Sequence, residues 1–367
     1  MSVGTLPTPL PVADRTGRNL ARVRRDLRRR GQARARLRTM EKPKALVTAP
    51  FRGAGLELLE SLCSEVVLDP WIDHRPLRLY NSEQLAERIA AEGANLLVVE
   101  SDSVKGPVLE LPLVAIGSCR GDPTNVDIPA ATAKAIPVLR APGRNADAVA
   151  EITIGLLFAV NRGIVRADMD VREGQVWRDG TIPYQRFRAW ELAGRTAGIV
   201  GLGAVGRATK WRLEGLGLNV ISYDPYAPDA THSLTDLLAE SDVISLHAAV
   251  TPESEHLIGA AQFSAMKEGA IFINSARAQL HDTDALVMAL QAGKLAGAGL
   301  DHFVGEHLPI DHPLCSMPNV VLTPHIGGAT WDTETRHSLS IAQGLEELFG
   351  RGRPTNLVNP EVLEGKR

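Results

Sequence analysis

The 367-residue chain has few cysteines and no long apolar run, and both shortages exclude classes of protein. Cys63, Cys119 and Cys315 are odd in number, lie far apart and form no CxxC pair. This usage argues against a disulfide framework or a zinc knuckle and predicts reduced thiols. The longest uncharged apolar run, Ile152–Val160, has nine residues, about half of what a membrane helix needs. We therefore expect a cytoplasmic protein without a membrane segment.

Basic residues are scarce outside the N-terminal segment. Residues 1–40 contain eleven Arg and two Asp, a formal charge of +9, whereas the remaining 327 residues sum to −12. An acidic body argues against a nucleic-acid-binding protein, whose body should itself be basic. We interpret residues 1–40 as a basic, disordered leader, and an early start codon upstream of Met40 would account for it. A transit peptide and an arm for an anionic surface are the alternatives, although the leader has no aromatic residue to stack on bases.

Strand and helix patterns alternate from Lys44 onward, which is typical of parallel sheets covered by helices. A long apolar helix over Ala146–Asn161 separates a first strand–helix set from a more regular second one. In the second set the expected strands are Thr196–Val200, Asn219–Tyr223, Val243–Leu246, Ala270–Asn274, Ala298–Leu300 and Val320–Leu322. Six strands with intervening helices indicate a doubly wound nucleotide-binding sheet.

A glycine-rich loop follows the first strand of that second set. Gly201, Gly203 and Gly206 have GxGxxG spacing and precede a predicted helix. Such glycines allow a tight turn, close approach of the backbone to a pyrophosphate, and close packing of the helix on the sheet. Asp224 ends the next strand, where an acid bonds the adenosine ribose and repels a 2′-phosphate. The segment after it has no Arg, so the pattern predicts NAD as the cofactor rather than NADP.

Three further strand ends of the second set carry charged or titratable residues. Arg277 follows the fourth strand, Asp301 and Glu306 follow the fifth, and His325 follows the sixth. Open α/β sheets bind their ligands at this edge. With the segments Ala148–Glu151, Met266–Gly269, Asn274–Arg277 and Pro324–Gly328, the chain closely resembles the D-2-hydroxyacid dehydrogenase family from about residue 44 to residue 360.

The resemblance implies an α/β fold of two Rossmann-like domains. A NAD-binding doubly wound sheet, residues 141–330, is inserted in a flavodoxin-like substrate domain, residues 41–140 and 331–367, and substrate is expected in the cleft between them. It also implies that Arg277 binds the carboxylate and keto oxygen of the substrate, and that His325 is the general acid and base with Glu306 as its partner. Histidine suits this role because its reference pKa lies near neutrality, and arginine offers a carboxylate two parallel donors.

The same resemblance assigns cofactor contacts along the edge of the NAD-binding sheet. It places the glycine loop on the pyrophosphate, two alanines and a serine on the adenosine side, and further residues around the nicotinamide. His247 is interpreted as a packing residue. The expected cofactor-binding residues are Gly201, Gly203, Ala204, Val205, Gly206, Asp224, Ala248, Ala249, Ser254, Ser275, Ala276 and Asp301.

Two segments depart from simple expectations. Family members hold the substrate carboxylate on a glycine-containing loop of the first domain, and here that loop has Arg120, Gly121 and Asp122, with Asp122 where glycine is usual. We expect all three to be near the substrate, with the charge of Asp122 either balanced by Arg120 or turned to solvent.

The loop that begins at Asp301 is rich in residue types that bind metals, namely Asp301, His302, Glu306, His307, Asp311 and His312. Its histidines are five apart and prolines exclude a regular helix, so we expect no metal there.

We therefore predict a NAD-dependent oxidoreductase that interconverts a D-2-hydroxy acid and its 2-keto acid, and the family implies a homodimer. A short phosphoglycerate dehydrogenase is one alternative. A non-catalytic NAD(H)-sensing protein, similar to corepressors that share this fold, is the other. A phosphorylated substrate would need extra cations, for which Arg120 is the evident candidate.

Overall fold

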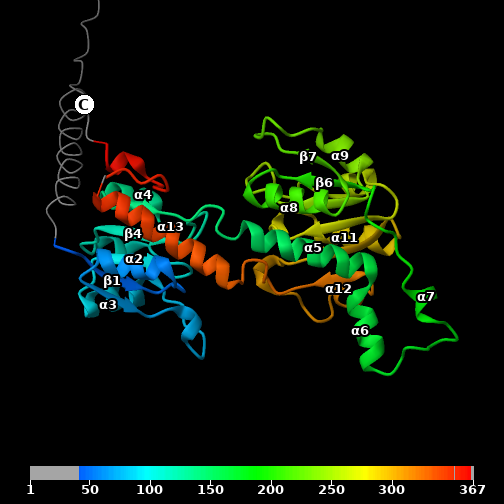
Figure 1. Cartoon of the computed structure of the whole chain (residues 1–367), viewed down its shortest axis with the longest axis horizontal. Helices are drawn as coiled ribbons and strands as arrows, with labels where there is room; N and C mark the ends of the chain where they lie inside the picture. The colour runs from blue at the N-terminus through cyan, green and yellow to red at the C-terminus, as the bar shows by residue number, and fades with distance from the viewer. Residues whose placement is uncertain (1–40, 351, 365–367) are drawn as a thin grey trace, which may run out of the picture. The chain divides into compact units, whose positions relative to one another are not determined.

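The structure is a computed structural model that describes residues 41–350 and 352–364. The basic leader predicted at residues 1–40 lies outside this part of the chain. The chain divides into two compact units, one running to Arg144 and resuming at Glu334, the other comprising Asn145–Thr333 (Figure 1). The sequence analysis places these junctions at 140/141 and 330/331. The second unit is thus inserted into the first.

Within the described residues, the first unit contains a sheet of five parallel strands in the order β2-β1-β3-β4-β5. This order is that of flavodoxin-like sheets, as the sequence analysis expected. Short apolar runs build it because both faces of such a sheet are buried. The strands are β1 (Lys44–Val47), β2 (Glu65–Leu68), β3 (Leu96–Val99), β4 (Ala115–Ser118) and β5 (Val138–Leu139).

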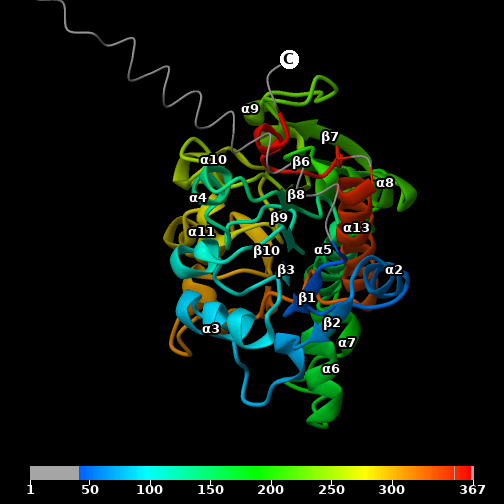
Figure 2. The ribbon, with the colours of Figure 1, turned by 90° about the vertical axis from the view of Figure 1, so that its left-hand side faces the viewer.

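Helices cover both faces of this sheet (Figure 2). Helices α2 (Ala54–Leu62) and α13 (Trp331–Gly350) lie on one face, and α3 (Ser82–Glu92) and α4 (Ile128–Ala133) lie on the other. Adjacent residues of β1 enter opposite cores, since Ala45 and Val47 pack with α2 and α13 whereas Leu46 packs with α3. The short 3-10 helices are η1 (Trp71–Asp73), η2 (Gly106–Glu110) and η5 (Pro360–Val362).

The second unit contains six parallel strands in the described part of the chain, in the order β7-β6-β8-β9-β10-β11. The sequence placed each of them, although β10 begins three residues earlier than predicted. The order reverses between β6 and β8, and such a switch point is where open α/β sheets bind their ligands. The strands are β6 (Thr196–Val200), β7 (Asn219–Tyr223), β8 (Val243–Leu246), β9 (Ala270–Asn274), β10 (Leu295–Leu300) and β11 (Val320–Leu322).

Two helical layers cover the faces of this second sheet. Helices α5 (Ala146–Arg162) and α8 (Ala204–Gly215) pack on one face. Helices α9 (Leu234–Glu240), α10 (Ala260–Ala265) and α11 (Thr283–Gln291) pack on the other. Short elements follow the strands at the carboxyl edge: η3 (Ala278–Leu280), η4 (Val304–Glu306) and α12 (Pro313–Ser316).

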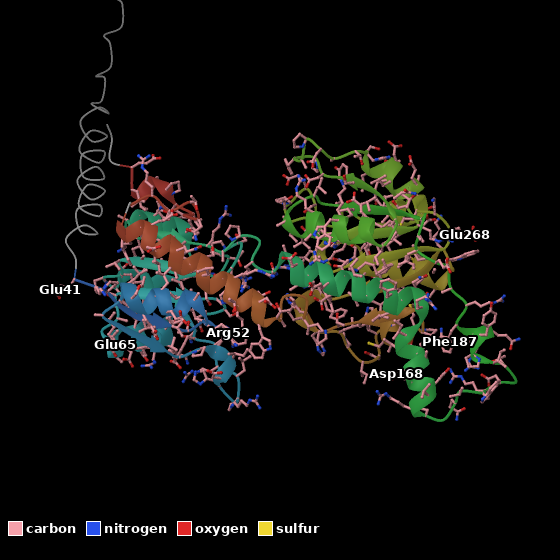
Figure 3. The ribbon with its side chains drawn as sticks, in the orientation of Figure 1. Glu41, Arg52, Glu65, Asp168, Phe187 and Glu268 are labelled. Atoms are coloured by element: carbon pink, nitrogen blue, oxygen red, sulfur yellow. The ribbon has the colours of Figure 1, made fainter. Side chains whose placement is uncertain are left out.

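Residues 164–190 form a helical arm that the sequence analysis did not predict (Figure 1). The arm contains α6 (Ile164–Arg172) and α7 (Pro183–Arg186). Asp170 is buried within it and accepts bonds from Arg178 and Arg186, each at 3.2 Å. Phe187, labelled in Figure 3, lies 5.5 Å from the guanidinium group of Arg186. The arm is therefore held by specific polar contacts rather than by an apolar core.

No single helix among residues 41–350 and 352–364 is long and apolar enough to cross a membrane. Helices α5 and α6 pass such a test only as a pair, by length and composition, and the pair is bent by 64°.

Candidate active site

The predicted functional residues of the second unit follow one transverse row of paired strand ends. Register places Tyr223, Val200, Leu246, Asn274, Leu300 and Leu322 side by side across the six strands. The next residues along each strand therefore emerge at the same edge of the sheet. Asp224 and the glycine loop lie on one side of this edge, and Arg277, Asp301 and His325 follow the strands on the other.

The glycine loop has room for a ligand at one glycine and none at the other two. Gly201 has a φ of +97°, and a Cβ there would lie 2.4 Å from the amide nitrogen of Ala248. A Cβ on Gly206 would lie 2.0 Å from the carbonyl oxygen of Gly201. A Cβ on Gly203 would meet nothing within 4 Å. Gly203 is also the N-cap of α8 and has no side chain to cap the helix. The loop thus leaves the α8 N-terminus open to a phosphate.

Asp224 is tied to this loop by its carboxylate. Its Oδ2 accepts a hydrogen bond from the amide of Leu202 at 2.7 Å, and its Oδ1 accepts one from the amide of Tyr226 at 2.8 Å. Arg207, on α8, makes a two-point ion pair with Asp229 at 2.6 and 2.8 Å. The hydrogen bond from Arg207 lowers the pKa of Asp229 to about 2. Arg207 is therefore already neutralised by Asp229.

The remaining predicted cofactor residues differ in how they lie. Ala204 and Ala249 are exposed, and Val205, Ala248 and Ala276 are half-buried. Ser254 bonds its own loop, since its hydroxyl donates to the carbonyl of Ala249 at 2.7 Å and accepts from the amide of Thr251 at 2.8 Å. His247 bonds Ser245 at 2.8 Å, and burial lowers its pKa to about 3. His247 is thus a packing residue, and the predicted cofactor contact of Ser254 stays a prediction.

Ser275 points away from the edge where we expected it. Its hydroxyl is buried and lies 2.6 Å from that of Thr153 on α5. Because residues alternate across a strand, the residue directly after the β9 row turns back into the helical layer. The Ser275 hydroxyl is therefore engaged with α5. That Ser275 borders the nicotinamide stays a prediction.

Arg277 is held by a buried asparagine that the sequence analysis did not single out. Asn274 donates from Nδ2 to the carbonyl oxygen of Arg277 at 2.8 Å and accepts at Oδ1 from the amide of Ala276 at 3.0 Å. The Arg277 side chain is exposed, and its Nη1 donates to the carbonyl oxygen of Ala276 at 2.6 Å. The guanidinium group is thus presented at the edge on a rigid turn.

His325 and Glu306 meet across two different strand ends. The Nδ1 atom of His325 lies 2.8 Å from Oε1 of Glu306, and both side chains are about half exposed. Both residues have a φ of +54°. Such a left-handed backbone is uncommon for residues other than glycine and often marks functional sites. The predicted acid–base pair is therefore assembled in the folded chain.

Asp301 is an anchor for the His325 loop. Its fully buried carboxylate accepts bonds from the hydroxyl of Thr323 at 2.6 Å and from the amides of Ile326 and Gly327 at 2.9 and 2.8 Å. Both oxygens are occupied by this loop. The expected contact of Asp301 with a nicotinamide carboxamide stays a prediction. The structure shows in addition that Asp301 holds the loop that contains His325.

His302 packs directly against His325, a contact that no sequence motif indicated. The ring centroids are 3.9 Å apart with the planes tilted by 56°. His302 is 5% exposed, and its Nδ1 has no hydrogen-bond partner among the described residues. Burial, with the nearby charges of His325 and Arg277, lowers the pKa of His302 to about 4. A buried imidazole with a lowered pKa therefore lies beside the predicted acid–base pair.

The predicted substrate loop belongs to the first unit. The carbonyl oxygen of Arg120 accepts from the amide of Ala141 at 2.8 Å, and Gly121 lies close to residues 141–143. Asp122 is exposed, and its carbonyl oxygen accepts from the amide of Thr124 at 3.0 Å. Asp122 is thus part of a solvent-facing turn before the buried Pro123.

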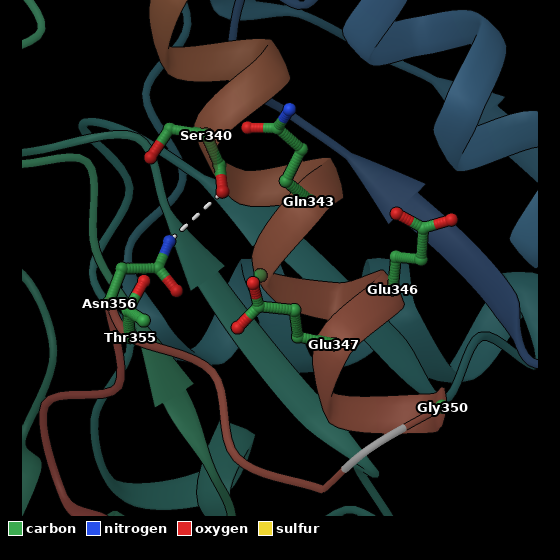
Figure 4. Close-up of a pocket in the computed structure, with 8 residues that line it drawn as sticks. Ser340, Gln343, Glu346, Glu347, Gly350, Thr355 and Asn356 are labelled. Carbon is green, nitrogen blue, oxygen red and sulfur yellow. Dashed lines mark hydrogen bonds between the residues drawn. The ribbon is translucent and has the colours of Figure 1, made fainter.

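Each unit also contains a cavity among its described residues. A cavity of about 450 Å³ lies beside His302 in the second unit and is lined by residues of η3, α11 and the 302–314 loop. One of about 440 Å³ lies in the first unit along α13 (Figure 4), where Asn356 donates from Nδ2 to the carbonyl oxygen of Ser340 at 3.0 Å. The latter contains none of the predicted site residues.

Comparison with known proteins identifies the family. A model described as the D-isomer specific 2-hydroxyacid dehydrogenase, NAD binding domain, matches residues 154–327. The glyoxylate reductase of Thermofilum pendens is 38% identical over 89% of this chain and 97% of its own length. The chain belongs to the D-2-hydroxyacid dehydrogenase family. It is accordingly an oxidoreductase of this family with a nicotinamide cofactor.

Two further relatives bear on its length and fold. The D-3-phosphoglycerate dehydrogenase of Methanocaldococcus jannaschii is 34% identical over 88% of this chain, which spans 61% of that protein. The apo D-lactate dehydrogenase of Escherichia coli superposes with a TM-score of 0.70 at 28% identity, covering 86% of this chain and 99% of that one. The D-lactate dehydrogenase structure confirms the two-domain α/β fold expected from the sequence.

Proposed function

We propose that this D-2-hydroxyacid dehydrogenase interconverts a small 2-keto acid and its D-2-hydroxy acid, with His325 as general acid and base. The observation that carries the proposal is the 2.8 Å contact between His325 and Glu306. It lies at the same sheet edge as the glycine loop. The chemistry that a bound nicotinamide supplies is hydride transfer to or from C2 of the substrate.

His325 would transfer the proton in this reaction. When hydride adds to C2 of a keto acid, the keto oxygen gains negative charge and must receive a proton. The imidazole can donate that proton and, in the other direction, remove it from the hydroxyl. The carboxylate of Glu306 contacts Nδ1 of His325, so it would orient the ring and leave Nε2 of His325 for the substrate. A carboxylate in this place also stabilises the protonated ring before it donates.

Arg277 would bind and polarise the substrate. A guanidinium group offers a carboxylate two parallel donors, which fixes the position of C2. Its charge also stabilises the developing negative charge on the keto oxygen. Asn274 supports this role because it holds the backbone of Arg277 and Ala276 in place. We extend the substrate site to Arg120, Gly121 and Asp122 as the family resemblance implies.

The cofactor we propose is NAD rather than NADP. The open space at Gly203 fits a pyrophosphate at the N-terminus of α8. Asp224 would accept bonds from the adenosine ribose and would repel a 2′-phosphate. Arg207, the arginine that could offset such a phosphate, is paired with Asp229. Around the glycine loop, Ala204, Val205, Ala248 and Ala249 would give apolar contacts, and Ala276 and Asp301 would lie toward the nicotinamide.

For the substrate we propose an unphosphorylated short keto acid such as glyoxylate or hydroxypyruvate. The Thermofilum pendens relative is named a glyoxylate reductase, and this chain covers 97% of it. Asp122, exposed in the predicted substrate loop, disfavours a doubly charged phosphate group. A short phosphoglycerate dehydrogenase is therefore the second choice.

A panel assay tests this proposal. We expect the protein to oxidise NADH when glyoxylate or hydroxypyruvate is added, as measured by the loss of nicotinamide absorbance. NADPH should support a kcat/KM at least about tenfold lower, because Asp224 faces the extra phosphate. Rates with 3-phosphohydroxypyruvate in the same panel report on the alternative. Absence of turnover over a broad set of 2-keto acids would remove the enzymatic proposal.

We further propose that the chain is a homodimer that uses the 164–190 arm. The arm exposes an unusual number of large apolar side chains, and such patches mark interaction surfaces. Two-fold homodimers are the commonest assembly of soluble chains. The most exposed apolar side chains of the arm are Val171, Trp177, Tyr184 and Trp190, each 65–75% exposed.

Light scattering after size-exclusion chromatography tests the dimer. We expect a mass twice the 39.5 kDa of one chain. The double variant Met169→Glu with Trp177→Glu should shift the protein toward monomer, because charges are costly inside an apolar interface. Met288→Glu is the matched control, since Met288 is similarly exposed on α11, at 59% against 51% for Met169. A dimer that withstands the double variant would place the interface elsewhere.

A further inference from the structure

We propose that the active site contains an inhibitory zinc site formed by His302, Glu306 and His325. This inference rests on the proposed function, because two of the three ligands would be the catalytic acid–base pair. One ligand atom from each of the three residues lies within 4.8 Å of the other two. Two imidazoles and one carboxylate are a ligand set that zinc uses in proteins.

The sequence pattern did not indicate that these three ligands lie together, because they follow different strands. His302 and Glu306 follow β10, whereas His325 follows β11. Within the loop itself the histidines are spaced five apart, which does not suit a local metal motif. The parallel pairing of β10 with β11 brings the third ligand to the other two.

The geometry requires only a small closure around the ion. Zinc bonds to nitrogen and carboxylate oxygen are about 2.0–2.2 Å long, so ligand atoms of a tetrahedral site lie roughly 3.3 Å apart. Glu306 and His325 have side chains that are 57% and 43% exposed, so they are able to rotate. His302 is buried and fixed, and its Nδ1 has no partner in the described part of the chain. One fixed and two adjustable ligands can therefore converge.

The electrostatics of the neighbourhood also admit a cation. Asp301 and Glu306 carry negative charge at the site, and Arg277 opposes them. The surplus carboxylate favours a divalent ion. A bound ion would take the His325 lone pair and the Glu306 oxygen away from proton transfer, so turnover would stop.

Calorimetric titration of the full chain with zinc chloride, after treatment with a chelator, tests the site without relying on turnover. We expect one zinc ion per chain and no binding of millimolar magnesium, which prefers oxygen ligands. In parallel, zinc should inhibit NADH oxidation, and EDTA should restore the rate.

Single-residue variants identify the ligands. His302→Val should weaken zinc binding by about 100-fold, because even outer-shell changes around metal ligands cost 10–100-fold. His307→Val is the matched control, since it removes an exposed histidine of the same loop and should bind zinc as the parent does. Glu306→Gln should also weaken binding, and it serves if His302→Val does not fold.

Several outcomes would overturn the site. These are absence of stoichiometric zinc binding, unchanged binding in both His302→Val and Glu306→Gln, or loss of binding in Cys315→Ser, which would move the ion to the exposed thiol. The zinc and functional proposals fail separately. Zinc bound by a chain with no turnover would count against the function alone, and an active enzyme that binds no zinc would count against the site alone.

Discussion

Replacement of His325 by asparagine is expected to lower kcat by about 10³-fold, within the range that general acid–base groups contribute. Asparagine is chosen because His325 has a φ of +54°, and asparagine adopts a left-handed backbone more readily than alanine does. The loop should therefore keep its shape while the proton donor is lost. Steady-state rates with NADH and a keto acid substrate measure the effect.

Nicotinamide binding separates chemistry from folding in this variant. We expect the dissociation constant for NADH, followed by fluorescence, to change by less than about threefold, because the glycine loop follows β6 at the other side of the sheet edge. His307→Asn, an exposed histidine of the neighbouring loop, is the control and should retain parental kcat. If His325→Asn lost NADH binding and kept its kcat at saturation, His325 would have to be reassigned to the cofactor site.

Substitution of Gly206 by alanine is expected to abolish measurable NADH binding and to destabilise the second unit. The new Cβ would lie 2.0 Å from the carbonyl oxygen of Gly201, so backbone must move against backbone. Overpacking of this kind costs about 1–3 kcal/mol. That cost corresponds to a Tm lower by roughly 3–10 °C for a unit of this size. Thermal unfolding and NADH fluorescence measure the two effects.

Two other glycines of the same region make this prediction specific. Gly215→Ala changes the last residue of α8, where nothing lies within 4 Å of the added carbon, and should leave both measurements unchanged or raise the stability slightly. Gly203→Ala should weaken NADH binding without lowering Tm, because its Cβ would enter the open space of the loop. NADH binding by Gly206→Ala with parental affinity would contradict the phosphate-loop assignment.

Local sequence patterns were sufficient to predict most of the strands and helices of the second unit. Its strands are largely apolar runs of three to six residues bounded by turns, and such runs locate buried strands without tertiary information. The residues that come directly after these strands could then be placed at one edge of the sheet, because parallel strands end at the same edge. Arg277, Glu306 and His325 could therefore be assigned to one site before any fold was available.

The arm and the roles of several polar residues were not accessible in this way. Helix α6 has a largely polar sequence with exposed apolar residues, so its pattern differs little from that of a surface loop. The hydroxyl groups of Ser275 and Ser254 bond Thr153 and Ala249 in the folded chain, and no sequence pattern indicated these partners. A side chain's partner depends on which element packs over it, and the local sequence does not contain that element.

The sequence by itself determined the alternation of strands and helices and the position of the glycine loop, which depend on periodicity and on residue type and are local properties. The proposed roles of Arg277, Glu306 and His325 come from the resemblance to the D-2-hydroxyacid dehydrogenase family. Only the tertiary structure decided that Asp301 anchors the His325 loop, that Asn274 supports Arg277, and that His302 lies 3.9 Å from His325. Each of these contacts joins residues from separate strands or turns, and strand pairing in the folded sheet is what brings them within reach.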